Sequence, residues 1–218
     1  MSKIVLFGAG GIFGRTFTQE ATGRGHQITA VVRNPGKYAD LATDEVTVVK
    51  GDARDAASIA EVATGHDVAV SAVNTFPGAP RTYLVDANAA LLAGLATAGV
   101  GRLLIVGGAA SLEVAPGTRL IDTPDFPDAY KAPALAHVDA LADLRTNHAD
   151  ATVDWVFASP AAFLDPDGPR IGVYRTGGDQ LLAKADGQSH ISYADFAMAF
   201  VDEIDNPHHH RERAHFAD

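Results

Sequence analysis

Hydrophobic and polar positions follow two periods along the chain, and they alternate from the first residues. Short apolar runs rich in Val, Ile and Leu predict strands that are covered on both faces, as in a parallel sheet. These runs occupy Lys3–Phe7, Gln27–Val32, Val46–Val49, Asp67–Ala72, Arg102–Val106 and Thr152–Ala158. Apolar positions at helical spacing predict helices over Ile12–Ala21, Ala56–Ala63, Thr82–Ala98 and Pro133–Asn147. This alternation implies right-handed crossovers and an α/β fold with a Rossmann-like, doubly wound parallel sheet.

The pattern changes after about residue 160. Two extended runs around a Gly-Gly turn predict a β-hairpin over Tyr174–Lys184. Ser192 is placed to cap a helix over Tyr193–Ile204, and Ala214–Phe216 predicts a last strand. The chain shows no internal repeat and no linker. We therefore predict a single Rossmann-like domain over residues 1–218, in which about 160–218 form a small C-terminal lobe.

Composition narrows the class of protein. The 218 residues are 47% hydrophobic and 20% charged, which is ordinary for a soluble globular chain. Lys and Arg number 17 against 27 Asp and Glu, so the net charge of −10 counts against nucleic acid and anionic membranes as partners. The absence of cysteine excludes disulfides, iron–sulfur clusters and thiol catalysis. The longest charge-free stretch, Ala87–Gly101, is too short to span a bilayer, and we expect a cytoplasmic protein.

A glycine-rich turn lies between the first strand and the first helix. It reads Gly8-Ala9-Gly10-Gly11-Ile12-Phe13-Gly14, which satisfies the G-x-G-x-x-G pattern of dinucleotide-binding folds. In such folds the glycines permit a tight turn, the approach of a pyrophosphate and close helix–strand packing. The phosphates meet free amides at the positive end of the helix dipole. The strand–turn–helix context favours this reading over a glycine turn without a ligand.

The end of the second strand bears on the choice of cofactor. NAD-preferring folds place an acid about 20 residues past the glycine turn, but this chain has none between Glu20 and Asp40. Arg33, followed by Asn34, stands there, and a guanidinium suits a 2′-phosphate. We therefore predict that NADP(H) is preferred over NAD(H), the alternative being a surface arginine that follows a strand.

The ends of the next two strands supply further candidates for contact with the cofactor. Asp52, with Ala53, is expected near the adenine, and Asn74, with Ala72 and Val73, near the ribose and pyrophosphate. Plain turn residues are the alternative at both places.

The usual catalytic pair of short-chain carbonyl reductases is missing. That pair is Tyr-x-x-x-Lys, whose tyrosine protonates the alkoxide left by hydride addition. None of the five tyrosines has a lysine four residues later, and Tyr130 and Lys131 are adjacent, so they cannot share a helix face. An oxidised flavin or a quinone accepts hydride without a dedicated acid, because its developing anion is delocalised.

Several segments together carry a resemblance to one family. They are the glycine turn, Arg33-Asn34-Pro35, Gly51-Asp52, Val106–Glu113 (VGGAASLE), Asp122–Pro127 (DTPDFP), Ser159-Pro160-Ala161 and Gly177–Gln180 (GGDQ). With these segments the chain resembles the bacterial NADH–flavin reductases, which are atypical short-chain dehydrogenase/reductases of the NAD(P)H-binding, NmrA-like group, related to flavin reductase/biliverdin reductase B. The resemblance covers nearly the whole chain. It implies a nicotinamide cofactor and an acceptor pocket at the carboxyl ends of the strands.

The resemblance also implies site residues. Gly107 and Ser159-Pro160-Ala161 are expected beside the cofactor. Ser111 falls where the catalytic serine of short-chain reductases lies, and it either orients the nicotinamide or the acceptor, or caps a loop. His137 falls near the position of the missing lysine, as a proton donor or as a half-buried histidine. Ala161-Ala162 stand where the biliverdin reductase relative has a histidine, which counts against a tetrapyrrole substrate.

Two aromatic residues, an Asp-rich loop and three consecutive histidines are further candidates for a functional role. Phe76 and Phe163 could lie under a flavin ring or simply pack. The Asp-rich loop over residues 122–128 is expected to act as a flap over the substrate pocket. We interpret His208-His209-His210 as a solvated turn, because adjacent histidines diverge and no carboxylate is spaced to join them, so no metal site is expected.

We therefore expect an NAD(P)H-dependent oxidoreductase that passes hydride to a small-molecule acceptor, FMN or another flavin, or a quinone. The candidate catalytic residues are Ser111, His137 and Tyr130. One alternative is a non-catalytic, NmrA-like NADP(H) sensor. Another is a ketoreductase or epimerase that lacks the Tyr-x-x-x-Lys pair. The acceptor's identity is left open, and so is assembly as a homodimer.

Overall fold

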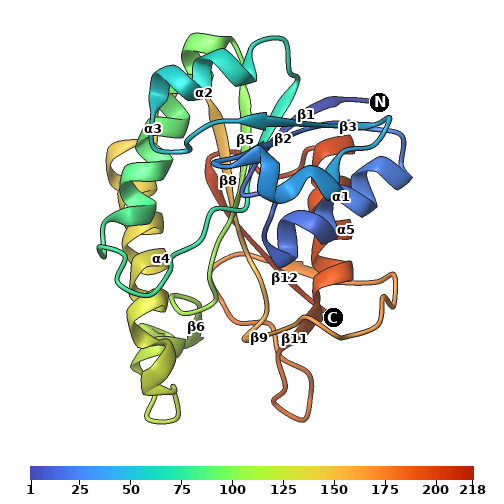
Figure 1. Cartoon of the computed structure of the whole chain (residues 1–218). Coiled ribbons are helices and arrows are strands. Elements are labelled where there is room, and N and C mark those ends of the chain that lie inside the picture. Colours follow the sequence, from blue (N-terminus) through green and yellow to red (C-terminus); the bar gives the residue numbers. More distant parts are fainter.

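The computed structural model describes residues 1–218 and has an eight-stranded sheet at its centre (Figure 1). Its strands lie in the order β10-β12-β8-β5-β4-β1-β2-β3, and all are parallel except β10, which runs antiparallel to β12. Their bounds are β1 Lys3–Phe7, β2 Gln27–Val32, β3 Val46–Lys50, β4 Val68–Ser71, β5 Arg102–Val106, β8 Asp154–Ser159, β10 Arg175–Gly177 and β12 Glu212–Ala217. This is the doubly wound Rossmann-like arrangement that the alternating pattern predicts, with the strand order reversing between β1 and β4.

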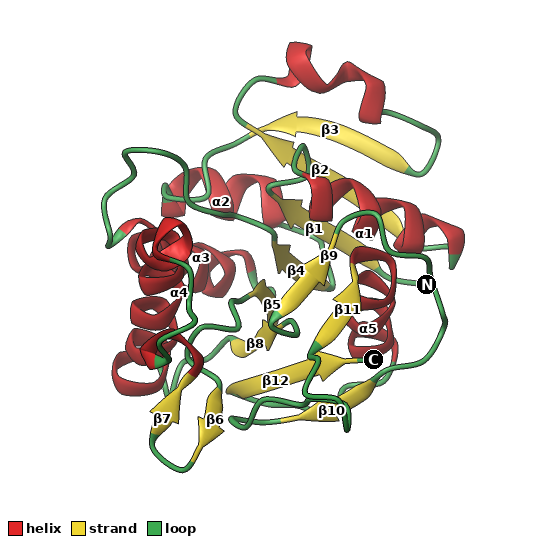
Figure 2. Ribbon diagram, turned by 90° about the horizontal axis from the view of Figure 1, so that it is seen from below, coloured by secondary structure: helices red, strands yellow, loops and turns green.

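Helices cover both faces of the sheet. One face carries α1 (Ile12–Gly23) and α5 (Tyr193–Asp205), and the other carries α2 (Ala56–Ala63), α3 (Tyr83–Ala98) and α4 (Asp128–Asn147) (Figure 2). No helix is long and apolar enough to cross a membrane.

The first strand shows why the sequence forms a sheet that is buried on both sides. Successive side chains of a strand point to opposite faces, so Ile4 and Leu6 join the core beneath α1 and α5. Val5 and Phe7 join the core beneath α2, α3 and α4. A continuous apolar run therefore serves two cores at once.

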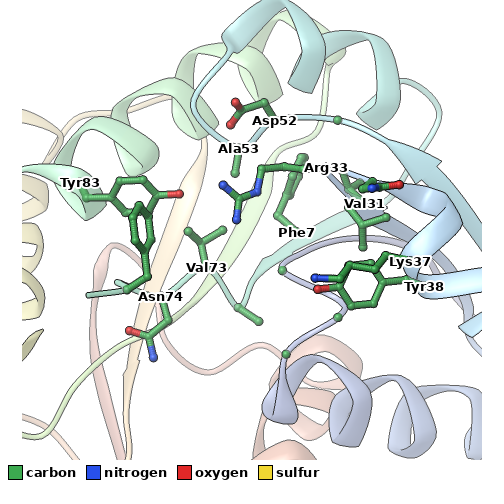
Figure 3. A pocket seen from close by; sticks show the side chains of 18 residues that line it. Phe7, Val31, Arg33, Lys37, Tyr38, Asp52, Ala53, Val73, Asn74 and Tyr83 are labelled. Atoms are coloured by element: carbon green, nitrogen blue, oxygen red, sulfur yellow. The ribbon is translucent and has the colours of Figure 1, made fainter. Parts of the chain in front are cut away.

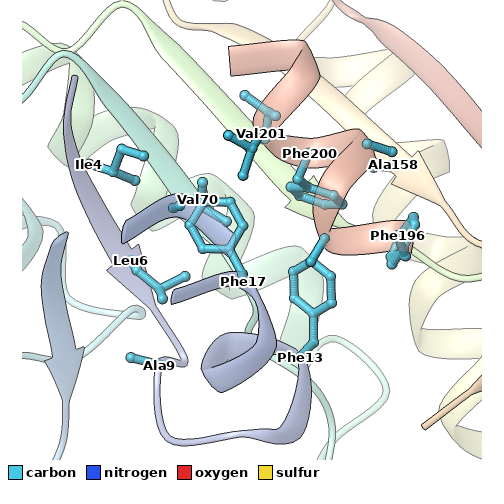
Figure 4. Packing of buried hydrophobic residues seen from close by; sticks show 14 of the residues in the cluster. Ile4, Leu6, Ala9, Phe13, Phe17, Val70, Ala158, Phe196, Phe200 and Val201 are labelled. Atoms are coloured by element: carbon cyan, nitrogen blue, oxygen red, sulfur yellow. The ribbon is translucent and has the colours of Figure 1, made fainter. Parts of the chain in front are cut away.

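An aromatic cluster fixes α1 against α5, and with it the position of the glycine turn. The Phe13 ring lies 4.9 Å from that of Phe200 and 5.3 Å from that of Phe196, and Phe17 packs against Phe200 (Figure 4). All four rings are buried. Aromatic pairs at such distances add about 0.5–1.5 kcal/mol each beyond the area they bury.

Two predicted elements differ from the structure. The hairpin over Tyr174–Lys184 is wrong: only β10 forms, and it pairs with β12 instead of a following strand. After the Gly-Gly turn the chain crosses to Glu113, whose N–H donates to Asp179 O and whose carbonyl accepts from Leu181 N. Helix α4 begins at Asp128 instead of Pro133, so that Pro133 lies inside the helix. Proline has no N–H to donate to the carbonyl four residues earlier, that of Ala129. The loss is tolerated because Ala129 is exposed to solvent.

Smaller elements complete the chain. The lobe expected over residues 160–218 holds a two-stranded sheet of β9 (Phe163–Asp165) and β11 (His190–Ser192), whereas α5 and β12 belong to the main layers. The loop after β5 carries a short hairpin of β6 (Glu113–Ala115) and β7 (Thr118–Arg119), followed by the 3₁₀ turn η2 (Leu120–Asp122). After β2 the chain forms the 3₁₀ helix η1 (Pro35–Leu41), which the turn signal at Asn34-Pro35 did not predict.

Candidate functional site

A cavity of about 460 Å³ opens at the carboxyl ends of β1, β2, β3 and β4, where the strand order reverses (Figure 3). In open α/β sheets this is the position at which ligands bind. We call it the nucleotide cavity. Ten of the residues expected to contact the cofactor line it: Gly8, Gly10, Gly11, Arg33, Asn34, Asp52, Ala53, Ala72, Val73 and Asn74.

Three glycines of the turn are required by the chain itself. Gly8 has a φ of +82°, and a Cβ there would lie 2.5 Å from the Ala72 carbonyl oxygen. A Cβ on Gly10 would overlap the Tyr38 ring, and one on Gly14 would lie 2.5 Å from the Gly8 carbonyl oxygen. These glycines therefore permit the tight turn and the close packing of α1 on β1.

Gly11 is different, because the protein leaves room for a side chain there. Its φ is −74°, and the nearest atom to a Cβ would be the Gly8 carbonyl oxygen at an ordinary 3.5 Å. Gly11 is exposed and is the N-cap of α1, which has no side-chain cap. The amides of Ile12, Phe13 and Gly14 have no acceptor in the chain. A bare N-cap above three free N–H groups fits a bound diphosphate.

The rim beyond β2 is basic. Arg33 and Lys37 both line the cavity and neither forms an ion pair, whereas the neighbouring Arg15 is bound to Asp40 at 2.7 Å. In Figure 3 the Arg33 side chain extends into the cavity below Asp52 and points toward the side of Val73 and Tyr83. Two uncompensated cations at this rim suit the additional phosphate of NADP(H).

Sequence reasoning missed part of this cavity. Phe7, Val31, Val32 and Gly51 lie at the ends of strands that it did identify, and their position at the carboxyl edge was the available signal. Lys37 and Tyr38 lie in η1, for which no helical signal was read. The remaining missed residue is Tyr83, against whose ring Phe76 packs edge-on at 5.2 Å.

Seven expected cofactor residues do not line the nucleotide cavity: Ile12, Phe13, Gly14, Gly107, Ser159, Pro160 and Ala161. The first three contribute backbone amides, since the Phe13 side chain is buried in the core and Ile12 is exposed. The buried Ser159 hydroxyl donates to the Gly108 carbonyl oxygen at 2.9 Å, which ties the end of β8 to the loop after β5. Pro160 and Ala161 are also buried, whereas Ala162 is exposed.

A second cavity, of about 430 Å³, lies beyond the ends of β5 and β8, and we call it the acceptor cavity. The loop after β5, the 122–128 segment, the start of α4 and the Ala162-Phe163 pair enclose it. Its lining consists of Gly108, Ala109, Ala110, Leu120, Thr123, Asp125, Phe126, Pro127, Tyr130, Ala134, Ala162 and Phe163. The expected flap thus lies along this cavity, and three aromatic side chains contribute to its wall.

His137 lines neither cavity but contacts one lining residue of each. Its Nε2 donates to Asn74 Oδ1 at 3.2 Å, because a carbonyl oxygen only accepts, and Asn74 lines the nucleotide cavity. The His137 Cβ packs against Gly108 of the acceptor cavity. Burial lowers the pKa of His137 to about 4, and its Nδ1 has no partner. At neutral pH the ring is therefore uncharged, and its one N–H holds the Asn74 side chain.

The other two catalytic candidates lie apart from each other. The Ser111 hydroxyl accepts a hydrogen bond of 2.8 Å from Arg213 Nη2 and lines neither cavity. Arg213 is almost fully buried, and its Nε lies 3.3 Å from Asp179 Oδ1 in an ion pair without hydrogen-bond geometry. Its Nη1 has no hydrogen-bond partner, and burial lowers its pKa to about 10. Tyr130 lines the acceptor cavity and is 65% exposed.

The model of a family described as NAD(P)H-binding matches residues 8–207. This chain belongs to the NAD(P)H-binding family. A Rossmann-fold member of such a family needs a glycine turn and a free helix N-terminus, and both are present in the nucleotide cavity.

Proteins that resemble this chain along its whole length come from several bacteria. YwnB of Bacillus subtilis, itself uncharacterised, is 41% identical over 213 residues, which are 97% of this chain and 96% of YwnB. A Burkholderia pseudomallei structure, provisionally named an exported protein, is 45% identical with a TM-score of 0.88, and all of both chains is covered. A Streptococcus pneumoniae structure, provisionally named an NADH-flavin reductase, is 34% identical with a TM-score of 0.85, again over all of both chains.

No group of three or more His, Asp or Glu side chains is arranged to hold a metal ion. The three consecutive histidines instead pair separately: His209 Nδ1 lies 2.9 Å from Glu203, and His210 Nδ1 lies 2.7 Å from Asp154. His209 is thus half-buried in an ion pair and is not part of a fully solvated turn.

Proposed function

We propose that this protein is an NAD(P)H-dependent oxidoreductase that passes a hydride to a flavin or a quinone-like acceptor. The observation that carries the proposal is the adjacency of two cavities, one polar with free helix amides, the other apolar and aromatic. His137 bridges their linings, since it donates a hydrogen bond to Asn74 of the first cavity and packs against Gly108 of the second. Bringing donor and acceptor rings together in near-attack geometry is a large share of such catalysis.

The residues divide the work of binding. The amides at the start of α1 hold the diphosphate, and Arg33 with Lys37 holds the 2′-phosphate, so NADPH is preferred over NADH. When bound, the reduced nicotinamide supplies a hydride. Asn74, held by His137, is placed to orient the nicotinamide end of the cofactor at the boundary of the acceptor cavity, from which the flap and Phe163 exclude water.

The chain offers no strong proton donor at this boundary, which favours an acceptor with a delocalised anion. His137 is neutral, and Lys131 is paired with Asp128 at 2.7 Å instead of lying behind Tyr130. A carbonyl substrate would need such a donor in its transition state. We therefore favour flavins and quinones over ketones, and the reduced ring takes its proton from water.

The test is anaerobic oxidation of NADPH, followed at 340 nm, with riboflavin, FMN and a naphthoquinone as separate acceptors. We expect acceptor-dependent oxidation that slows when the hydride carried on C4 of NADPH is replaced by deuterium. Tight NADP(H) binding without turnover of any acceptor would contradict the proposal and favour the sensor. Turnover of ketones alone would favour the ketoreductase.

A cytoplasmic location accompanies the proposal, because reduced pyridine nucleotides are made and used there. Since the Burkholderia relative is provisionally named an exported protein, fractionation of the native host is the appropriate test. Recovery outside the cytoplasmic membrane would contradict it.

A further inference from the structure

The charges around the acceptor cavity bear on the acceptor's own charge. Among the side chains that line the cavity, none is basic, and the one ionisable acid is Asp125. Phe126, Tyr130 and Phe163 supply the aromatic surface. A cavity with this lining can stack a planar ring but offers nothing to neutralise an anion.

The basic residues next to the cavity are already paired with acids. Arg119, which precedes Leu120, forms a two-pronged bond to Asp122 at 2.7 and 2.9 Å. Lys131, which follows Tyr130, lies 2.7 Å from Asp128. Asp125 itself forms no ion pair. The flap together with Arg119 and Lys131 on either side of it therefore carries a net charge of −1.

The nucleotide cavity makes the contrast plain. There, Arg33 and Lys37 form no ion pair, and the amides of three residues at the start of α1 have no acceptor. Groups that can bind a phosphate are therefore present in the nucleotide cavity and lacking in the acceptor cavity. The protein as a whole carries a net charge of −10.

We infer that the acceptor is an uncharged planar ring without a phosphate, so that riboflavin or a simple quinone is used in preference to FMN. This inference rests on the proposed function for its chemistry: NADPH and a proton convert the ring to its two-electron-reduced form, and NADP⁺ is released. FMN differs from riboflavin only in its 5′-phosphate, so the two form a matched pair.

The experiment measures binding separately from turnover. Riboflavin and FMN are titrated with the NADP⁺-loaded protein, and quenching of flavin fluorescence reports stacking on the aromatic wall. At about 10 mM ionic strength we expect FMN to bind at least about fivefold more weakly than riboflavin. The difference should shrink in 0.5 M salt, because the Debye length falls from about 30 Å to about 4 Å.

Two variants locate the effect. Asp125→Lys places a cation in the flap. The Kd for FMN divided by the Kd for riboflavin should then fall to one or below. Asp44→Lys makes the same change in net charge on an exposed, unpaired residue before β3, at the opposite edge of the sheet, and should leave the ratio unchanged.

The outcomes are separable from those of the proposed function. Riboflavin binding more tightly than FMN without any NADPH oxidation would refute the reductase and retain the assignment of the cavity. Equal or tighter binding of FMN, or binding of neither ring, would overturn the inference. Equal effects of the two variants would also overturn it, since net charge would then explain the preference.

Discussion

Replacing Gly11 by alanine separates the needs of the fold from the needs of the ligand. The built Cβ meets no atom closer than 3.5 Å and the backbone is extended, so the folded chain accepts the methyl group. Alanine is a poorer N-cap than glycine, and we expect a loss of at most about 1 kcal/mol in the free energy of unfolding. For a chain of this size that lowers Tm by about 2–4 °C.

Nucleotide binding should fall far more steeply. A methyl group at the N-cap keeps the diphosphate away from the free amides of the first turn of α1. Losing two hydrogen bonds to charged oxygens, at about 1.5–3 kcal/mol each, raises the Kd for NADP⁺ at least about a hundredfold. The assay is isothermal titration calorimetry beside a thermal melt. Gly23→Ala, at the far end of the same helix with nothing within 4 Å of the new Cβ, is the control and should bind normally. An unchanged Kd in Gly11→Ala would refute this account of the turn.

Three further predictions concern single side chains. Arg33→Asp should abolish the preference for NADPH, a change of about 10- to 150-fold in the ratio of kcat/KM for the two cofactors, and unchanged Michaelis constants would argue against its role. Ser111→Ala removes the one hydrogen bond of the buried Arg213 side chain and leaves it only its ion pair with Asp179, so we expect a loss of about 1–3 kcal/mol in denaturant unfolding with no change in the KM for the acceptor; the reverse would make the serine catalytic. Because the pKa of His137 is about 4 in the folded state and about 6.5 when unfolded, the folded state binds fewer protons. Stability should therefore fall as the pH drops from 6.5 towards 4, by up to about 3 kcal/mol from this residue, less so in His137→Asn, and kcat should show no inflection near pH 6.5. An inflection there that disappears in His137→Asn would contradict the neutral ring.

Much of the fold could be predicted because its signals are local. In the run from Lys3 to Phe7 the side chains on both faces of the strand are apolar, as a strand covered on both faces requires. The turn after it needs the glycines at 8, 10 and 14. The hairpin at Tyr174–Lys184 was wrong because the partner of β10 is β12, some 40 residues later. No local pattern distinguishes a strand that turns back on itself from one that joins a distant edge.

The candidate site divides in the same way. Positions at strand ends, such as Asn74 and Asp52, follow from the topology of a doubly wound sheet. Lys37 was missed because its place at the rim depends on how η1 folds back over the glycine turn. The surroundings of Ser111 could not be predicted, since Arg213 lies 102 residues away in the sequence.

The neutral state of His137 was equally hidden. A histidine on an Ala- and Leu-rich helix has an ordinary pKa until packing removes its water, and here Gly108 and Phe157 supply that packing. A pKa near neutrality is expected for an exposed imidazole, and burial in the folded chain lowers it because the charged form loses its water.

The central claim is that the turn between β1 and α1 holds a nicotinamide dinucleotide. A calorimetric titration of the purified protein with NADP⁺ tests it most directly. We predict saturable heat with one nucleotide bound per chain, together with a rise in Tm. No heat and no thermal stabilisation with NADP⁺ or NAD⁺ at millimolar concentration would contradict it.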